Sequence, residues 1–252
     1  MSFNVAATAY DRFMGRFSGP LSVGFADWLD VRGGSTALDV GSGPGALTEV
    51  LADRLGAASV IAVDPSEPFV AAIRVRLPEV VVFQASAEEL PFGDQSFDLA
   101  VAQLVVHFMS DPQRGVGELR RVTRTGGVVA VSVWDFEGRR APQSTFLGAL
   151  LSVVPDADDE VGRAGAHRGE LVSLLEKAGC RDVEETEISV TVTSATFEEW
   201  WEPYTLGVGP AGAQLVALDA ERQELVRQRC LELLGTGPIG TTATAWAARG
   251  IR

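Results

Sequence analysis

The sequence predicts an α/β protein: a doubly wound, mostly parallel seven-stranded sheet with helices on both faces and a small helical cap. Short apolar runs alternate with amphipathic stretches between about residues 37 and 134, as strands and helices do in such sheets. A glycine-rich loop directly follows the first of these runs and opens a helix. The chain of 252 residues is long enough to bury a core of this size without disulfide bonds or structural metals.

The apolar runs of this region are rich in β-branched or small apolar residues and are bounded by Gly, Asp or Pro, as buried parallel strands are. Leu47, Leu51 and Leu55 recur at helical spacing after the first run. Another helix is expected to begin at Asp111-Pro112, where Asp can cap the first turn, and to end at Gly126-Gly127. The expected strands are Thr36–Val40, Val60–Val63, Val80–Phe83, Leu99–Ala102 and Val128–Val133.

Beyond Trp134 the pattern is looser and predicts three helices and two strands: Phe146–Val154, Gly169–Ala178 and Ala220–Leu234, then Glu185–Thr193 and Thr241–Ala248. The segment Ser194–Gly240 is longer than a connection between neighbouring strands needs. We therefore expect one domain over residues 1–252, with a core of about 20–193 plus 241–252 and a cap from 1–19 and 194–240. Phe3–Phe17 and Ser194–Gly240 are expected to pack together over the ligand edge and to close on the bound ligand.

Charge and composition exclude several classes of partner. Lys+Arg 21 against Asp+Glu 34 gives a net charge of −13, the opposite of the basic footprint that nucleic-acid binders carry. No run approaches the roughly 18 apolar residues of a membrane span, and the N-terminus lacks the layout of a signal peptide. The two cysteines form no CxxC pair, and no metal-ligand spacing is present. We expect a cytoplasmic monomer or homodimer that binds neither nucleic acid, membrane nor metal.

The glycine loop and the end of the second strand together predict a nucleoside site. Gly41, Gly43 and Gly45 let the backbone approach a ligand closely at the carboxyl edge of the sheet. Asp64 ends the second strand about twenty residues further on, where a carboxylate can accept hydrogen bonds from a ribose diol. Asp39 beside the loop would repel a pyrophosphate but attract an ammonium or sulfonium group. A cationic nucleoside that bears an amino acid therefore fits better than NAD(P), although a nicotinamide-dependent oxidoreductase stays an alternative.

Four ordered segments resemble those of class I S-adenosylmethionine-dependent methyltransferases: ALDVGSGPG, VIAVDPS, AEELPFGDQSFDLAVAQLVVHFMSD and LRRVTRTGGVVAVSVWD. The resemblance covers about residues 36–134 and extends weakly to YDRFMGRFSG and FEEWWEPYTLGVGPAG, which are similar to small-molecule enzymes of the ubiquinone/menaquinone-biosynthesis type. It implies the Rossmann-like methyltransferase fold, the cofactor S-adenosyl-L-methionine and the product S-adenosyl-L-homocysteine. A catalytically silent cofactor-binding protein remains a second alternative.

The resemblance also implies roles for individual residues. The glycines would line the methionine portion and the ribose, Asp39 would stabilise the amino group and Asp64 would hold the ribose hydroxyls. Gln103 would offer its carbonyl or side chain to the methionine ammonium. Ser86-Ala87 stands where the family usually has Asp-Ala beside the adenine. The remaining candidates are Pro65 and Ser66 at the adenine and Tyr10 and Arg16 at the methionine carboxylate.

Two further sets of residues concern the methyl acceptor. His107, just past the fourth strand, is a candidate general base or a packed histidine. Trp200, Trp201 and Tyr204 either line a substrate pocket or form core. The fourth strand ends Ala102-Gln103-Leu104-Val105 and lacks the Asn/Asp-Pro-Pro-Tyr/Phe signature of the enzymes that methylate amines in nucleic acids. We expect a small-molecule acceptor that is methylated at oxygen, carbon or nitrogen.

Overall fold

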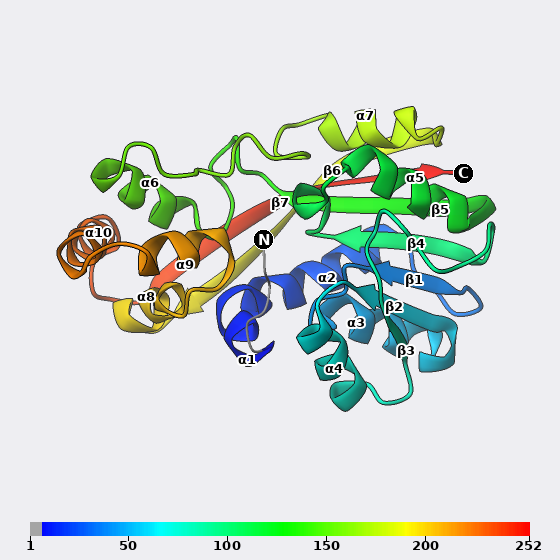
Figure 1. Ribbon diagram of the computed structural model, residues 1–252, viewed down its shortest axis with the longest axis horizontal. Helices are drawn as coiled ribbons and strands as arrows, with labels where there is room; N and C mark the ends of the chain where they lie inside the picture. The colour runs from blue at the N-terminus through cyan, green and yellow to red at the C-terminus, as the bar shows by residue number, and fades with distance from the viewer. Residues whose placement is uncertain (1–6) are drawn as a thin grey trace.

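The computed structural model describes residues 7–252, and these form one seven-stranded sheet in the order β3-β2-β1-β4-β5-β7-β6 (Figure 1). The five neighbouring strands β3, β2, β1, β4 and β5 run parallel to one another, whereas β7 is antiparallel to both β5 and β6. The predicted fold class is therefore confirmed. The strands are β1 (Ala37–Val40), β2 (Val60–Asp64), β3 (Val81–Gln84), β4 (Phe97–Gln103), β5 (Thr123–Trp134), β6 (Arg181–Ser194) and β7 (Ile239–Ile251).

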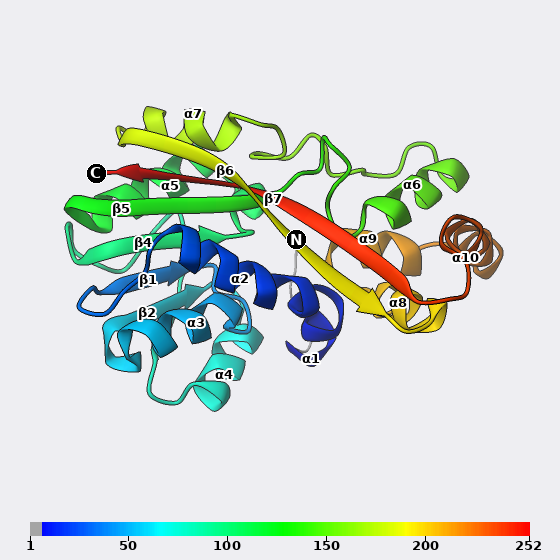
Figure 2. The ribbon, with the colours of Figure 1, turned by 180° about the vertical axis from the view of Figure 1, so that it is seen from behind.

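Helices cover both faces of the sheet, so the central strands are buried on both sides. The helices α2 (Arg16–Trp28), α3 (Ala46–Leu55) and α4 (Glu67–Arg76) pack on one face, as Figure 2 shows for α2 and α3. The helices α5 (Pro112–Val122) and α7 (Glu170–Lys177) pack on the other. Successive residues of β4 point to opposite faces of the sheet. Val101 therefore packs in the core beneath α3 and α4, and Ala102 in the core beneath α5 and α7. This double burial explains the near-continuous apolar runs.

Helix α5 begins as predicted but ends earlier. Asp111 accepts a hydrogen bond from the Arg114 N–H (3.0 Å), with Pro112 in the first turn. The helix stops at Val122, because the N–H groups of Gln95 and Ser96 donate to the last carbonyls of the helix and the chain turns directly into β5. Gly126 lies inside β5 with φ +80°, where the pairing with β4 shifts register. The expected helix end at Gly126-Gly127 is therefore wrong.

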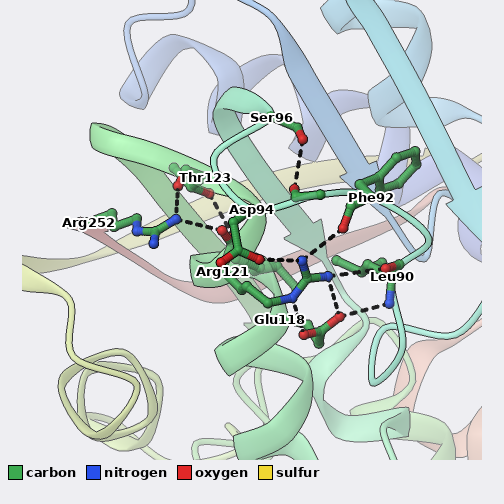
Figure 3. A network of polar contacts seen from close by, with 10 residues as sticks. Leu90, Phe92, Asp94, Ser96, Glu118, Arg121, Thr123 and Arg252 are labelled. Carbon is green, nitrogen blue, oxygen red and sulfur yellow. Dashed lines mark hydrogen bonds and ion pairs between the residues drawn. The ribbon is translucent and has the colours of Figure 1, made fainter.

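A polar network holds the loop before β4 against the end of α5 (Figure 3). Arg121 donates to the carbonyl oxygens of Leu90 (3.1 Å) and Phe92 (2.8 Å) and to the carboxylates of Asp94 (2.9 Å) and Glu118 (2.6 Å). Arg252 donates to the carbonyl oxygens of Arg121 and Thr123, so the last residue of the chain is tied to the same place. This network lies at the amino end of β4, away from the carboxyl edge.

Beyond the carboxyl ends of the parallel strands, four helices form a separate layer, at the left of Figure 1. They are α6 (Ser144–Val153), α8 (Phe197–Thr205), α9 (Gly209–Val216) and α10 (Ala220–Leu234), and α6 packs against both α9 and α10. The structure differs from the predicted division in two respects: α6 lies with the cap helices, and the boundary at residue 19 falls inside the continuous helix α2. The division into core and cap stays an expectation.

The N-terminal helices pack against this layer. They comprise α1 (Ala7–Tyr10) and a π-helical turn, η1 (Asp11–Gly15), which leads into α2. Phe13 contacts Tyr204 edge to face at 5.2 Å, and Arg12 pairs with Glu202 at 2.7 Å. The expected contact between the two ends is thus seen at Arg12 and Phe13. Residues 3–6 lie outside the described part, and closure on a ligand stays a prediction. The short turns are η2 (Ala57–Ser59) and η3 (Val106–Phe108).

Candidate functional site

A cavity of about 420 Å³ lies at the carboxyl ends of β1, β2, β3 and β4. Its volume falls within the range of small-molecule sites. The walls come from the glycine loop, the turn from β2 into α4, the residues after β4, and the N-terminal helices. The predicted residues that line it are Tyr10, Asp39, Gly41, Gly43, Asp64, Pro65, Ser66 and Gln103.

The glycine loop folds back on the end of β2. Gly41 and Ser42 donate their N–H groups to the Val63 carbonyl (2.8 and 3.0 Å). Gly41 has φ +69°, and a Cβ atom there would lie 2.5 Å from the side chain of Val105, so only glycine fits. The Gly43 N–H donates to Oδ2 of Asp64 at 2.8 Å. The loop and the strand end are therefore held as one unit.

Asp64 is buried, and its carboxylate is fixed by backbone donors on both oxygens. Oδ1 accepts from the Ser66 N–H at 2.8 Å, and Oδ2 accepts from Gly43. Burial raises the pKa of Asp64, and the two backbone hydrogen bonds act in the opposite direction. Each carboxylate oxygen has two acceptor positions, so one position on each remains for a ligand hydroxyl pair.

Asp39 carries a buried oxygen without a partner. Its Oδ2 accepts from Thr48 Oγ1 at 2.6 Å, whereas Oδ1 has no hydrogen-bond partner within residues 7–252. Burial raises the pKa of Asp39 to about 7, against the opposing effect of the Thr48 hydrogen bond. A buried carboxylate with an unsatisfied oxygen is costly, and a cationic ligand group in the cavity would satisfy it.

Gln103 lines the same cavity and carries a second unpartnered oxygen. Its Nε2 donates to Ser22 Oγ (2.8 Å) and to the Ser18 carbonyl (3.3 Å), both on α2. These bonds fix the amide orientation, and Oε1 has no partner in the described part of the chain. Asp39 and Gln103 thus provide two acceptors suited to an ammonium group.

Tyr10, the last residue of α1, lines the cavity and contacts Phe69 edge to face at 5.2 Å. Burial, followed by the charge of Asp64, raises the pKa of its phenol, so Tyr10 is a neutral hydrogen-bonding group. Arg16 does not line this cavity. Its Nη2 donates to Ser194 Oγ (2.8 Å) and lies 3.7 Å from Glu199 Oε1, because the first turn of α2 faces the end of β6 and α8. In this structure Arg16 joins α2 to the cap, and its expected role at a ligand carboxylate stays a prediction.

Three other expected residues also lie outside the lining. Gly45 caps α3 with φ +98°, next to Ile73. Ser86 lies in the turn after β3, and Ala87 is part of the core. In their place Gln84, at the end of β3, lines the cavity and donates to the Pro65 carbonyl at 3.0 Å. Sequence reasoning missed Gln84, although the parallel pairing of its strand with β2 sets it beside Asp64.

Other residues that the sequence did not single out complete the walls. Most are apolar or present backbone, so their types carried no signal of a ligand. They are Ser18, Ser42, Ala46, Leu47, Glu67, Pro68, Phe69, Leu104, Val105 and Phe108.

A second, small cavity of about 30 Å³ adjoins the first, since Tyr10, Leu104 and Phe108 line both. His107 lies in this second cavity and not in the first. Burial, followed by the charge of Arg163, lowers the pKa of His107 to about 3, so the imidazole is neutral. Gln143 shares the cavity with His107, and no motif or spacing in the sequence marks it as a site residue.

Trp200, Trp201 and Tyr204 line neither of these two cavities. Tyr204 stacks on Phe146 at 4.3 Å, and Trp201 stacks on Phe197 at 6.2 Å. All three are buried in the core of the cap, because α8 presents them toward α6 and the N-terminal helices. Of the two alternatives for these residues, the structure shows the packed arrangement, and a role in a substrate pocket stays a prediction.

Within residues 7–252 no group of three or more His, Cys, Asp or Glu side chains is arranged to hold a metal ion. None of the described helices is both long and apolar enough to cross a membrane.

The known proteins to which this chain is similar include several methyltransferases. Residues 38–131 match the family model described as a methyltransferase domain. A malonyl-[acyl-carrier protein] O-methyltransferase of Geobacter sulfurreducens is 31% identical over 185 residues, which cover 72% of this chain and 67% of that protein. An uncharacterized methyltransferase of Mycobacterium tuberculosis is 35% identical over 151 residues, 60% of this chain and 59% of the relative. The chain thus spans about three fifths of the length of several such relatives.

Solved structures share the fold. The YcgJ protein of Bacillus subtilis superposes with a TM-score of 0.60 at 19% identity, over 93% of this chain and 97% of that one. A putative type II methyltransferase of Anaeromyxobacter dehalogenans gives a TM-score of 0.62 at 21% identity, over 91% and 95% of the two chains. At these identities the likeness concerns the fold alone.

Proposed function

Because the chain belongs to the class I S-adenosylmethionine-dependent methyltransferases, we propose that it transfers the methyl group to a small-molecule acceptor at oxygen, carbon or nitrogen. The observation that supports this most is the pair of adjoining cavities, one of about 420 Å³ with acceptors for a charged nucleoside and one of about 30 Å³ lined by apolar side chains together with His107, Gln143 and Glu160. A recess of this small size suits part of a small molecule better than a polymer.

The larger cavity fits the family's cofactor in the chemistry of its unpartnered atoms. Asp39 Oδ1 and Gln103 Oε1 are buried acceptors without partners among the described residues, and an amino-acid ammonium group is the donor that both lack. We assign Asp64 to the ribose hydroxyls, and Gln84, Pro65 and Ser66 to the base. Tyr10, on α1, would cover the bound cofactor.

When bound, the cofactor would supply a methyl group on positively charged sulfur, which is open to attack by a lone pair of the acceptor. The chain's own residues align the acceptor and exclude water. Leu104 and Phe108 stand between the two cavities and provide an apolar boundary for this reaction. Neutral His107 can accept a hydrogen bond from the acceptor, but with a pKa of about 3 it is a weak base.

Two relatives are named for acceptors that carry carboxylates. One is the Geobacter malonyl-[acyl-carrier protein] O-methyltransferase, and the other is a trans-aconitate 2-methyltransferase of Variovorax paradoxus, 31% identical over 54% of this chain and 52% of its own length. The described lining of this chain's second cavity includes no Arg or Lys side chain. We therefore propose that its acceptor differs from theirs in charge.

The experiment supplies methyl-labelled S-adenosylmethionine to the wild-type protein with a metabolite extract divided into a low-molecular-weight and a macromolecular fraction. We expect label in the low-molecular-weight fraction, and much less of it with an Asp64→Ala variant that is folded but binds cofactor weakly. Label confined to the macromolecular fraction would contradict the small-molecule proposal. The alternatives of a nicotinamide-dependent oxidoreductase and of a silent binding protein are set aside, because the relatives are methyltransferases.

A further inference from the structure

Three of the residues that line the second cavity each carry a buried polar atom without a hydrogen-bond partner. These atoms are Trp134 Nε1, Gln143 Oε1 and His107 Nδ1, and within residues 7–252 no group is placed to bond them. The three side chains are 1%, 4% and 9% exposed. Unsatisfied buried polar atoms are rare in proteins, and three around one small cavity indicate a bound polar group.

The chemistry of the three atoms is complementary. An indole nitrogen can only donate, so Trp134 requires an acceptor from the ligand. The amide of Gln143 is oriented by its Nε2, which donates to Glu160 Oε2 at 2.6 Å, so its Oε1 requires a donor. The neutral imidazole of His107 can provide either, according to its tautomer.

A hydroxyl group is the simplest group that satisfies both requirements. A carboxylate offers no donor to Gln143, and an ammonium offers no acceptor to Trp134. Charge disfavours an anion as well, because the buried Glu160 lines the same cavity, and the described lining contains no cationic side chain. Arg163 is not among the described lining residues, and its guanidinium forms ion pairs with Glu160 (3.7 Å) and with Asp158 (2.7 Å).

We propose that this cavity is the acceptor subsite and that Trp134, Gln143 and His107 bind a hydroxyl group of an uncharged acceptor molecule. The proposal rests on the proposed methyl transfer to a small molecule and names the class of that molecule. A volume of about 30 Å³ accommodates a group of roughly the size of a water molecule, so it holds the hydroxyl head only. The body of the acceptor then lies past Leu104 and Phe108, next to the larger cavity.

The sheet provides a matched control for Trp134. Trp246 also has a buried indole nitrogen without a partner in the described chain, and it lines neither of the two cavities. In the β5–β7 register Trp134 pairs with Ala245, so Trp246, the next residue of β7, faces the opposite side of the sheet. The two indoles therefore share burial and strand environment but not the cavity.

The test uses the full chain saturated with S-adenosylhomocysteine, with ¹⁵N-labelled indole groups observed by NMR. The probes are a panel of uncharged alcohols and phenols, each accompanied by its methyl ether and by a carboxylate of matched shape, such as phenol, anisole and benzoate. Trp134→Phe and Trp246→Phe assign the two signals. We expect hydroxyl compounds to shift the Trp134 signal and not that of Trp246, with at least tenfold weaker binding of the ethers and carboxylates.

Three results would overturn the proposal: no hydroxyl compound shifts the Trp134 signal, the ethers or carboxylates bind as tightly, or Trp134→Phe binds the hydroxyl compounds as the wild type does. Trp134→Phe should weaken that binding about tenfold, and Trp246→Phe should not. Turnover of the same compounds is measured separately. If hydroxyl compounds bind at Trp134 while only macromolecules are methylated, the small-molecule function fails and the hydroxyl site stands. If Trp134→Phe methylates a small molecule with the same KM as the wild type, the small-molecule function stands and the hydroxyl site fails.

Discussion

Replacing Asp39 by asparagine should stabilise the cofactor-free protein and weaken cofactor binding at the same time. Asp39 is buried, only one of its oxygens is hydrogen-bonded, and burial raises its pKa from 3.8 to about 7. Asparagine keeps an oxygen for Thr48 and removes the buried charge. It also removes the charge that would attract the cofactor's ammonium group.

The magnitude follows from the pKa. A rise of about three pH units corresponds to about 4 kcal/mol against ionisation in the folded state, which is an upper limit for the gain. The folded protein holds a proton on Asp39 between about pH 4 and pH 7 that the unfolded chain has released, so the free energy of unfolding decreases as pH rises through this window. Asparagine does not titrate, so its advantage is absent near pH 4 and complete above pH 7. We expect about 1–3 kcal/mol at pH 8.

Denaturant unfolding of both proteins at pH 5 and pH 8, without cofactor, measures this difference, and calorimetry with S-adenosylhomocysteine measures affinity. Loss of a charge-assisted hydrogen bond predicts roughly 10- to 150-fold weaker binding. Asp98→Asn is the control of opposite sign, because the Thr36 N–H (2.8 Å) lowers the pKa of Asp98 at the far end of the sheet. It should destabilise at pH 8 and leave affinity unchanged. An Asp39→Asn advantage that fails to grow from pH 5 to pH 8 would refute the reasoning.

The remaining predictions concern three charged side chains. Asp64→Ala should weaken binding of S-adenosylhomocysteine about five- to two-hundredfold in calorimetry, because ribose hydroxyls lose buried acceptors; unchanged affinity would remove Asp64 from the site. Arg16→Ala should leave that affinity within about twofold and lower the melting temperature, since Arg16 joins α2 to Ser194 and Glu199; a tenfold loss of affinity would instead support its role at a ligand carboxylate. Arg121→Ala should cost about 2 kcal/mol in denaturant unfolding with KM unchanged, because its partners lie at the amino end of β4; an altered KM would show that the loop before β4 reaches the site.

The fold could be predicted from the sequence because buried parallel strands and a glycine loop each have a recognisable local sequence pattern. β1 begins one residue later than expected and ends at the expected Val40, and α10 has the expected bounds, since caps and periodicity are properties of neighbouring residues. The end of α5 could not be read in this way. It depends on backbone donors of Gln95 and Ser96, which precede the helix in the chain and reach it only through the tertiary fold.

The site residues, too, divide into those that local sequence identifies and those that depend on the tertiary fold. Asp39 and Asp64 were identifiable because Asp39 is the penultimate residue of β1 and Asp64 the last residue of β2, both at the ligand edge of the sheet. The direction of the Arg16 side chain depends on where α2 begins and on what the cap places beside it, and neither has a local signal. Gln143 was equally hidden: an ordinary polar residue before α6 becomes notable only when folding buries its oxygen without a partner.

The helices α8, α9 and α10 are inserted between two strands whose ends are already neighbours. Ser194 and Ile239 form the last pair of the β6–β7 ladder, so the whole intervening segment leaves and re-enters the sheet at one point. Such a segment can be exchanged for a short turn without breaking a strand. The larger cavity has no described lining residue from this insertion, whereas Val208 to Ala211 form a wall of the smaller one. On the proposed assignment of the two cavities, the insertion contributes part of the acceptor site and none of the described cofactor site. A graft of another insertion at this hairpin should therefore alter binding of the acceptor and leave the affinity for S-adenosylhomocysteine the same.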